Sequence, residues 1–448
     1  MTATLTRTEA EVQLRRQFEA VAAELPGGNW VPQARARAMR AFETSGLPHR
    51  RIEAWKYTDL RNGLKTAYPP AKPLVSKVVS DGLADALGAE LAGLVCIRLV
   101  LVNGRFVSAS IPAGHEPGES WQFEPLAGAL GRPGYEWMQP GFATEGHSGD
   151  DPVRDLNTAF ATDGIMLAVA EGTRLALPVH VVSVVAGDEP ASVAIRNLVR
   201  VGAGARAVVI ESQVGLGSAA DKRLATAVTQ VEVAEGGELH HVLHTAGGAN
   251  AVHLGRWEVE LAARASYRGF QLTAGSGLTR NETMVGFTGP DASLDLSGLM
   301  LGRGSDHIDT TLVVNHTTTG CESRELFKAV LDGRARSVFQ GKIVVAPEAQ
   351  KTDGKQMAQA LMLSEDAEFD SKPELEIYAD DVACGHGSTA AELDEDMLFY
   401  LRARGLPLAE ARALLIESFT AGALDKIEDE ALRDAMRAVA VRWLEAGR

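Results

Sequence analysis

A tight turn of small residues and a strand follow one another in the stretch Gly202-Ala-Gly-Ala-Arg-Ala-Val-Val-Ile-Glu-Ser-Gln213. Glycine allows the backbone to turn sharply, whereas valine and isoleucine favour strands. The same order, a small polar turn and then strand-forming residues, returns several times between residues 165 and 382. Further turns of this kind lie at 235–238, 263–266, 289–292, 332–335 and 365–368. This repetition decides the fold of the central region.

The turns lie 26 to 43 residues apart, and the intervals hold two or three strand-length segments with little helical sequence. Such a pattern is typical of a solenoid, in which each coil buries its side chains only against its neighbours. We therefore predict a mainly β protein with a right-handed parallel β-helix over residues 161–390. The alternative is a β-sandwich, but more than about fifteen short strands are many for a single sandwich.

Helices are expected on the N-terminal side of this region. Apolar residues recur at helical spacing over residues 7–25 and 32–44, so residues 1–90 are predicted to form a helical domain. Residues 91–160 are predicted to hold a strand pair and a linker excursion. The two strands surround Asn103-Gly104, which is a typical two-residue hairpin turn.

Three short amphipathic helices are expected in residues 391–448. Asp394 is a suitable N-cap for the first helix, Pro407 opens the second, and the third carries Leu432 and Trp443 on one face. These helices form either a cap over the last coil of the solenoid or a docking module for a partner. The sequence pattern leaves both interpretations open.

The composition excludes several classes of function. The chain has 448 residues, of which 45% are hydrophobic, and its net charge is −15. Nucleic acids and anionic membranes require basic patches, so neither is an expected partner. The three cysteines are too far apart for a disulfide framework, and no apolar run approaches the length of about 18 residues that spans a membrane. The first residues look like neither a secretory signal nor a transit peptide, which predicts a cytoplasmic location.

The sequence lacks the loops that bind nucleotides or activate a serine. A phosphate-binding loop needs serine or threonine after its Gly-Lys pair, but neither Gly341-Lys342 nor Gly354-Lys355 is followed by one. The stretch 215–220 does not form the Gly-x-Ser-x-Gly elbow of hydrolases. A stand-alone β-helix enzyme acting on carbohydrate or acyl groups is the alternative function, and it would need a carboxylate pair or a histidine base in a groove.

Several histidines lie close together in the sequence. In a strand, His240 and His244 face one side and His241 the other. They are either part of a metal site or polar surface positions. His307 and His316 are expected to form a polar ladder along one face of the solenoid.

Of the three cysteines, Cys96 is expected to be an inert core thiol, and Cys321, which lies between charged residues, to be more exposed. The third, Cys384, precedes His386 by two residues, so an extended segment places both side chains on one face. Thiolate and imidazole together suit iron, zinc or copper(I). Because two ligands do not complete a tetrahedral site, the others must come from elsewhere in the chain, from a partner subunit or from the bound species.

Several longer stretches resemble the SufB/SufD family of iron–sulfur cluster assembly proteins. The resemblance covers essentially the whole chain and is densest between about residues 310 and 420. The stretches that carry it are Arg50–Thr58, Cys321–Leu326, Gly333–Lys342, Gln350–Lys355, Ala367–Glu376, Asp380–Thr389 and Leu393–Gly405.

This resemblance implies a right-handed parallel β-helix with helical N- and C-terminal domains, and a scaffold role without catalytic activity. A subunit of this type pairs with a SufB-like subunit, or with a second copy of itself when isolated. It binds a SufC-like ATPase through the C-terminal helices, and that partner supplies ATP hydrolysis.

The resemblance further implies that a nascent iron–sulfur cluster or iron is held transiently at the interface of the two subunits. His386 is then the implicated metal ligand, and Cys384 is an accessory candidate. No cofactor is expected to remain bound to this chain alone.

Overall fold

The structure is a computed structural model that describes residues 7–74, 77–135, 138–142, 151–217, 221–275 and 277–446. Residues 136–137 and 143–150, within the region 91–160 predicted to hold the excursion, lie outside the described residues. Within the described residues, nineteen strands form two sheets, A and B, and consecutive strands of the solenoid alternate between the sheets. The predicted parallel β-helix is confirmed, because successive coils stack in parallel with unbroken register, as β10 (Val252–Leu261) and β12 (Leu278–Phe287) do. Parallel stacking excludes the β-sandwich alternative.

Sheet A has the order β18 (Glu368–Ile377), β16 (Arg336–Val345), β14 (His307–His316), β12 (Leu278–Phe287), β10 (Val252–Leu261), β8 (Arg223–Val233), β6 (Ala191–Val201), β4 (Ile165–Val169), β3 (Trp121–Pro125). Sheet B has the order β19 (Ala383–Ala391), β17 (Asp353–Met362), β15 (Glu322–Leu331), β13 (Ser293–Gly302), β11 (Ser266–Ala274), β9 (Glu238–Ala246), β7 (Arg206–Leu216), β5 (Val179–Ala186), β1 (Ile97–Val102), β2 (Arg105–Ser110).

Each coil contributes one strand to each sheet, so the solenoid has two edges with turns. The turns that the sequence predicts at 202–206 and 289–292 join sheet A to sheet B, whereas those at 332–335 and 365–368 join sheet B to sheet A. The longest interval between predicted turns separates those at 289–292 and 332–335, which lie on different edges of the solenoid. The repeat itself is regular, since β13, β15 and β17 begin at residues 293, 322 and 353.

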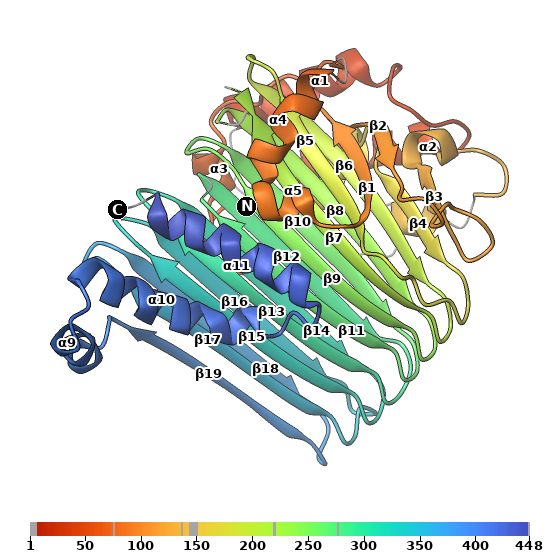
Figure 1. Ribbon diagram of the computed structural model, residues 1–448. Coiled ribbons are helices and arrows are strands. Elements are labelled where there is room, and N and C mark those ends of the chain that lie inside the picture. Colours follow the sequence, from red (N-terminus) through yellow and green to blue (C-terminus); the bar gives the residue numbers. More distant parts are fainter. Residues whose placement is uncertain are drawn as a thin grey trace, which may run out of the picture.

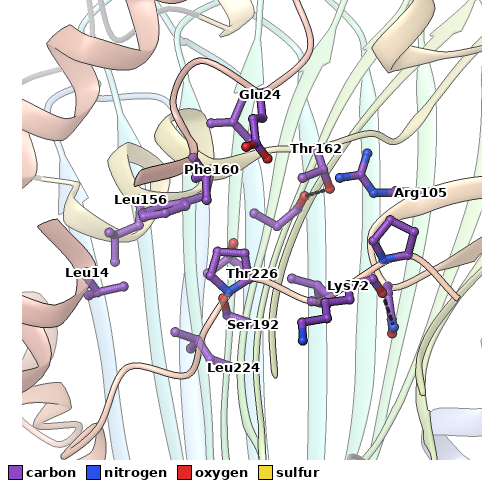
Figure 2. Close-up of a pocket in the computed structure, with 18 residues that line it drawn as sticks. Leu14, Glu24, Lys72, Arg105, Leu156, Phe160, Thr162, Ser192, Leu224 and Thr226 are labelled. Atoms are coloured by element: carbon purple, nitrogen blue, oxygen red, sulfur yellow. Dashed lines mark hydrogen bonds between the residues drawn. The ribbon is translucent and has the colours of Figure 1, made fainter. Parts of the chain in front are cut away.

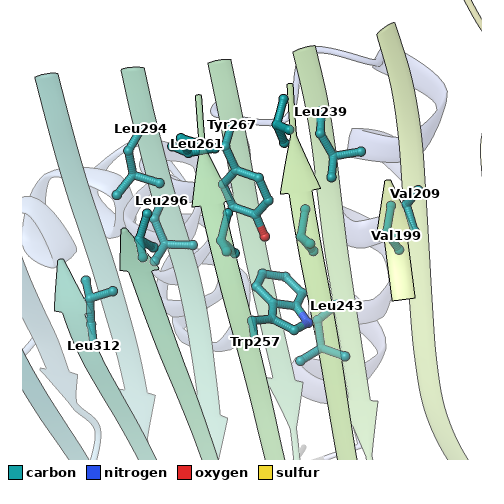
Figure 3. Packing of buried hydrophobic residues seen from close by; sticks show 14 of the residues in the cluster. Val199, Val209, Leu239, Leu243, Trp257, Leu261, Tyr267, Leu294, Leu296 and Leu312 are labelled. Carbon is teal, nitrogen blue, oxygen red and sulfur yellow. The ribbon is translucent and has the colours of Figure 1, made fainter. Parts of the chain in front are cut away.

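The space between the sheets is a continuous apolar core. Alternate residues of each strand point inward, and equivalent residues of successive coils stack along the solenoid. Figure 3 shows Trp257 and Tyr267 between leucines of neighbouring coils, among them Leu294 and Leu296, and all four are buried. Full burial of such a side chain stabilises the fold by about 1.5–3 kcal/mol.

Helices cover the outer faces of both sheets (Figure 1). The N-terminal helices are α1 (Glu9–Val21), α2 (Val31–Ser45), η1 (Glu53–Trp55), α3 (Leu60–Gly63), α4 (Lys77–Leu87), α5 (Ala89–Gly93), α6 (Leu126–Ala129), α7 (Gln139–Phe142) and α8 (Pro152–Phe160). The C-terminal helices are α9 (Glu395–Ala403), α10 (Leu408–Leu424) and α11 (Glu430–Glu445). Side chains of α1, α2 and α8 pack with sheet A, and side chains of α4, α5, α10 and α11 pack with sheet B.

The C-terminal helices do not cap the solenoid. Helix α10 packs against β13 and β15, and α11 against β11, so both lie along the outer face of sheet B. Asp394 caps α9 with two hydrogen bonds, as expected from the sequence. The described residues therefore leave the last coil uncovered, which removes the capping interpretation.

The predicted hairpin is confirmed at Asn103-Gly104, where both residues have positive φ angles of 50° and 71°. Strand β1 pairs antiparallel with β2 and parallel with β5, so the hairpin extends sheet B rather than standing apart. Strand β3 extends sheet A in the same way, through antiparallel pairing with β4. The N-terminal end of the solenoid thus finishes in antiparallel strands.

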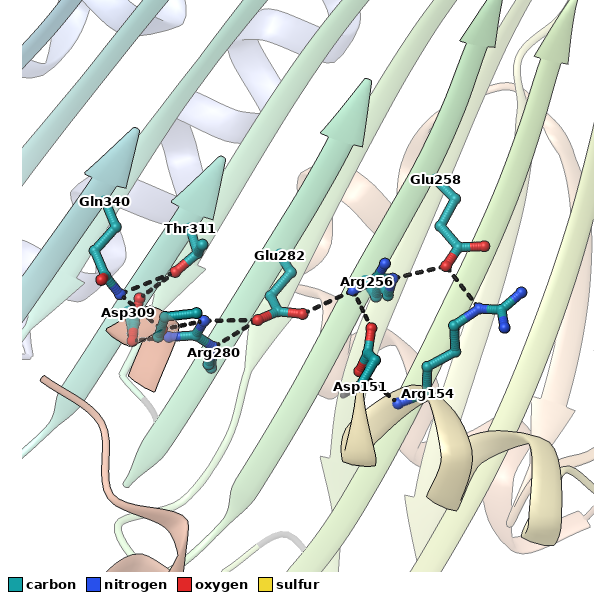
Figure 4. A network of polar contacts seen from close by, with 10 residues as sticks. Asp151, Arg154, Arg256, Glu258, Arg280, Glu282, Asp309, Thr311 and Gln340 are labelled. Atoms are coloured by element: carbon teal, nitrogen blue, oxygen red, sulfur yellow. Dashed lines mark hydrogen bonds and ion pairs between the residues drawn. The ribbon is translucent and has the colours of Figure 1, made fainter. Parts of the chain in front are cut away.

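A partly buried ladder of opposite charges lies where the N-terminal segments cover sheet A (Figure 4), and Arg154 of α8 joins it at Glu258, 2.8 Å away. Arg256 bridges Glu258 at 2.7 Å and Glu282 at 3.0 Å, and Arg280 joins Glu282 at 2.6 Å. The Arg280 guanidinium also lies 3.9 Å from the ring centroid of Trp55, which is buried. The Arg280 guanidinium also donates to the carbonyl of Ala54 at 2.8 Å, so one arginine of the ladder holds the family-like stretch 50–58 by a cation–π contact and a hydrogen bond.

Candidate functional site

Cys384 and His386 lie on β19, the last strand of sheet B. They are paired in register with Gly354 and Gln356 of β17, and they share the inward face of the strand. Cys384 packs partly against the solenoid core, whereas His386 is exposed. The structure thus brings the two predicted ligands together on one face at the open end, as the Cys-x-His spacing requires.

The strands at this end have free edges. Strands β18 and β19 are the terminal strands of their sheets, and no described residue pairs with their outer sides (Figure 1). No residue of β19 is fully buried. An unpaired edge of this length is a ready template for another chain.

The thiol of Cys384 is protonated at neutral pH. Burial raises its pKa above the usual value, the carboxyls of Asp353 and Glu325 raise it further, and a backbone contact at Gly354 opposes them. Metal binding to this thiol therefore has to displace a proton. Among the described residues, no three His, Cys, Asp or Glu side chains already converge to hold a metal ion. The donor types suit iron, but two donors leave the coordination incomplete.

Two inward polar residues next to this pair were not predicted from the sequence. Glu325 on β15 and Gln356 on β17 share one row with His386, and both are buried. A signal for Glu325 exists in the sequence, because it has the same strand phase as the core residues Phe327 and Ala329. Burying a carboxyl among core residues costs folding free energy unless the carboxyl has a hydrogen-bond or ionic partner.

Cys321 is not an exposed thiol. Its side chain is 0% exposed, compared with 7% for Cys96, so the expected order of exposure is wrong. The Cys321 sulfur lies 3.5 Å from the carbonyl oxygen of Gly289, in the turn one coil away. Cys96 is buried as expected, and burial raises its pKa.

The histidines of β9 are interior or covered. His241 faces the core, where its Nε2 lies 2.7 Å from Glu211 and its ring stacks on Trp257. His240 and His244 face outward but lie beneath the C-terminal helices, and burial lowers the pKa of each to about 4. They are therefore not surface positions, because the helices cover this part of sheet B.

His307 and His316 do not form a ladder. They lie at opposite ends of β14 and on opposite faces. The Nε2 of His307 lies 2.8 Å from the hydroxyl of Thr58, outside the solenoid, whereas that of His316 lies 3.1 Å from the hydroxyl of Ser323, inside it. They are nine residues apart, and an odd separation places two residues of a strand on opposite faces.

A pocket of about 210 Å³ lies far from β19, between α1, α8 and sheet A (Figure 2). Leu14, Leu156, Phe160 and Leu224 supply apolar walls, and its lining contains neither histidine nor cysteine. The pocket therefore offers no histidine base for the alternative enzyme. None of the described helices is long and apolar enough to cross a membrane.

Comparisons with known proteins agree with this architecture. Residues 184–419 match the family model "SUF system FeS cluster assembly, SufBD core domain", and residues 13–181 match "SufBD protein N-terminal region". The chain is 30% identical to the iron–sulfur cluster assembly protein SufD of Escherichia coli, over 93% of each chain. It is 29% identical to a SufBD family protein of Synechocystis, over 87% of this chain and 86% of the other.

Proposed function

The chain belongs to the SufBD family of iron–sulfur cluster assembly proteins and is SufD-like, and we propose on this premise that it is a non-enzymatic scaffold subunit. In this proposal it pairs with a SufB-like subunit through its last coil. A nascent cluster or iron is bound transiently between the two subunits, with His386 as a ligand and Cys384 as an accessory one.

One observation carries the proposal: a thiol and an imidazole lie on the last strand, at an edge that no described residue covers. A partner strand that pairs with β19 would place its own side chains beside them, by the mode of β-strand addition. The ligands missing from this chain would then come from the partner. An incomplete donor set is expected of a site that two subunits share.

The SufC-like ATPase is proposed to dock on the C-terminal helices. Phe399 and Tyr400 of α9 and Leu408 of α10 are large apolar residues with 74%, 57% and 47% of their surface exposed. Clustered exposed apolar side chains are typical of protein interfaces. The SUF system of the relatives includes further components, and an ATPase among them would supply the hydrolysis that the loops of this chain do not support.

The variant His386→Ala tests the site. The side chain is exposed, so its removal should leave the fold and the complex intact. We expect the complex with SufB- and SufC-like partners to lose most of its iron and acid-labile sulfide, measured after anaerobic purification. His115→Ala, in the loop after β2, is the matched control and should load normally. Full loading of the His386→Ala complex would exclude the proposed role.

A further inference from the structure

Three polar side chains form one row from the core of the solenoid to its open end. Glu325, Gln356 and His386 are register partners on β15, β17 and β19, and all three point inward. Neighbouring strands lie about 4.8 Å apart, so each side chain stands next to the one before it. The row continues the candidate site inward, behind the exposed imidazole.

The two inner members of this row lack hydrogen-bond partners. Glu325 and Gln356 are 2% and 3% exposed. Within the described chain, neither carboxyl oxygen of Glu325 and neither amide atom of Gln356 has a partner with hydrogen-bond geometry. The nearby Ser323 hydroxyl is instead paired with Nε2 of His316, at 3.1 Å. Nearly all buried polar groups in folded proteins have a partner. Three of these four atoms of Glu325 and Gln356 are oxygens, and they lie behind the candidate ligands, where they are available to hold a bound species.

The surroundings favour a cation as that species. The amide of Gln356 occupies the gap between the sheets, where a Cβ at Gly341 of β16 would overlap it. Burial raises the pKa of Glu325 to about 8, and the nearby Ser323 hydroxyl and Arg324 lower it too little to compensate. The carboxylate of Glu325 and the amide of Gln356 both offer oxygen atoms, and oxygen ligands suit divalent cations.

We propose that Glu325 and Gln356 form an inner binding site for ferrous iron behind His386, which deepens the proposed function and rests on it. Carboxylate oxygen, amide oxygen and imidazole nitrogen are donors that suit divalent first-row metals. As the ion binds, Glu325 releases its proton to solvent, and no electron is transferred. The ion enters from the open end, and a partner subunit that covers β19 would close the site.

The test is an anaerobic titration of the full, isolated chain with Fe²⁺, with Co²⁺ as a spectroscopic stand-in. Glu325→Gln keeps the shape of the protonated carboxyl, so its melting temperature should match that of the unaltered chain. We expect Glu325→Gln to weaken cation affinity by about tenfold or more. Gln356→Met, which removes only the amide, should also weaken it. Asp380→Asn, an exposed carboxyl at the same end, should not.

The outcomes separate this inference from the function on which it rests. Unchanged affinity in Glu325→Gln, with loss in His386→Ala, would overturn the inner site and leave the shared site standing. Absence of cation binding by the unaltered chain would also overturn it, because all three donors belong to this chain. Weakened cation binding in Glu325→Gln, with full cluster loading of the His386→Ala complex, would keep the inner cation site and exclude only the proposed role of His386 in cluster assembly.

Discussion

Cys321 and Cys384 lie near the same edge of the solenoid, yet only Cys384 reaches solvent. The charged neighbours Glu322 and Arg324 suggest exposure for Cys321, but they point to the opposite face from the inward residues of their strand. Later coils then cover the inward face completely. Local sequence therefore predicts which face of its strand a residue occupies. Whether that face is exposed depends on how many coils follow the residue in the solenoid.

The buried histidines make stability depend on pH. His253 is fully buried without a partner for either ring nitrogen in the described chain, and burial lowers its pKa to about 3. Because the folded-state pKa lies below the unfolded value of about 6.5, this contribution to stability is complete above about pH 6.5. It is lost as the pH falls toward 3, by up to about 1.4 kcal/mol per pH unit.

His253→Leu should therefore flatten the pH dependence of the unfolding free energy, measured by urea titration between pH 4.5 and 7.5. Comparison with the unaltered chain isolates this group, since other titrating residues are common to both. Equal slopes for His253→Leu and the unaltered chain would show that the native state accommodates the protonated imidazole.

At the scale of elements, the sequence predicts local features better than their placement. The turns, the Asn103-Gly104 hairpin and the cap at Asp394 follow from local backbone requirements, and all are present. The position of the C-terminal helices on the solenoid does not follow from their own sequence. It depends on apolar residues of sheet B, such as Phe270 and Val330, that lie far earlier in the chain. The surface against which a helix face packs cannot be predicted from the sequence of that helix alone.

The surface of α9 gives a prediction for the ATPase partner. Phe399→Asp places a charge at a side chain that is 74% exposed, so the fold should be unaffected while an apolar interface is disrupted. We expect loss of co-purification with the SufC-like partner and an unchanged melting temperature. Val95→Asp, at another exposed apolar residue, is the control and should retain the partner.

Point variants are preferable here to deletion of the C-terminal helices. Leu424, Leu432 and Met436 are buried against sheet B, so a deletion would uncover the core as well as remove the docking surface. Retention of the ATPase by Phe399→Asp would place the docking surface elsewhere on the chain.

At the scale of the whole molecule, the two ends of the solenoid differ. The N-terminal end of sheet B closes with β2, which is six residues long and pairs with β1 through an irregular register. Such short, irregular edges resist pairing with other chains. At the other end, β18 carries Pro373 and several charged residues, whereas β19 contains no proline and no Asp, Glu, Lys or Arg. The edge of β19 thus lacks the features by which natural edge strands resist pairing, as the proposed partner strand requires.

The backbone direction of β19 allows this pairing to be tested at one atom. The N–H of Ala383 donates to the carbonyl of Thr352, the residue before β17. Successive residues of a strand point alternately to either side, so the N–H of Ser388 points to the open side. Ser388→Pro removes this donor without breaking a bond to β17, and edge strands tolerate proline. We expect the variant to stay folded but to lose pairing with the SufB-like subunit, and with a second copy of itself, in sedimentation experiments. Ser388→Ala keeps the donor and should pair normally, so an intact complex with Ser388→Pro would mean that β19 does not join the partner by strand addition.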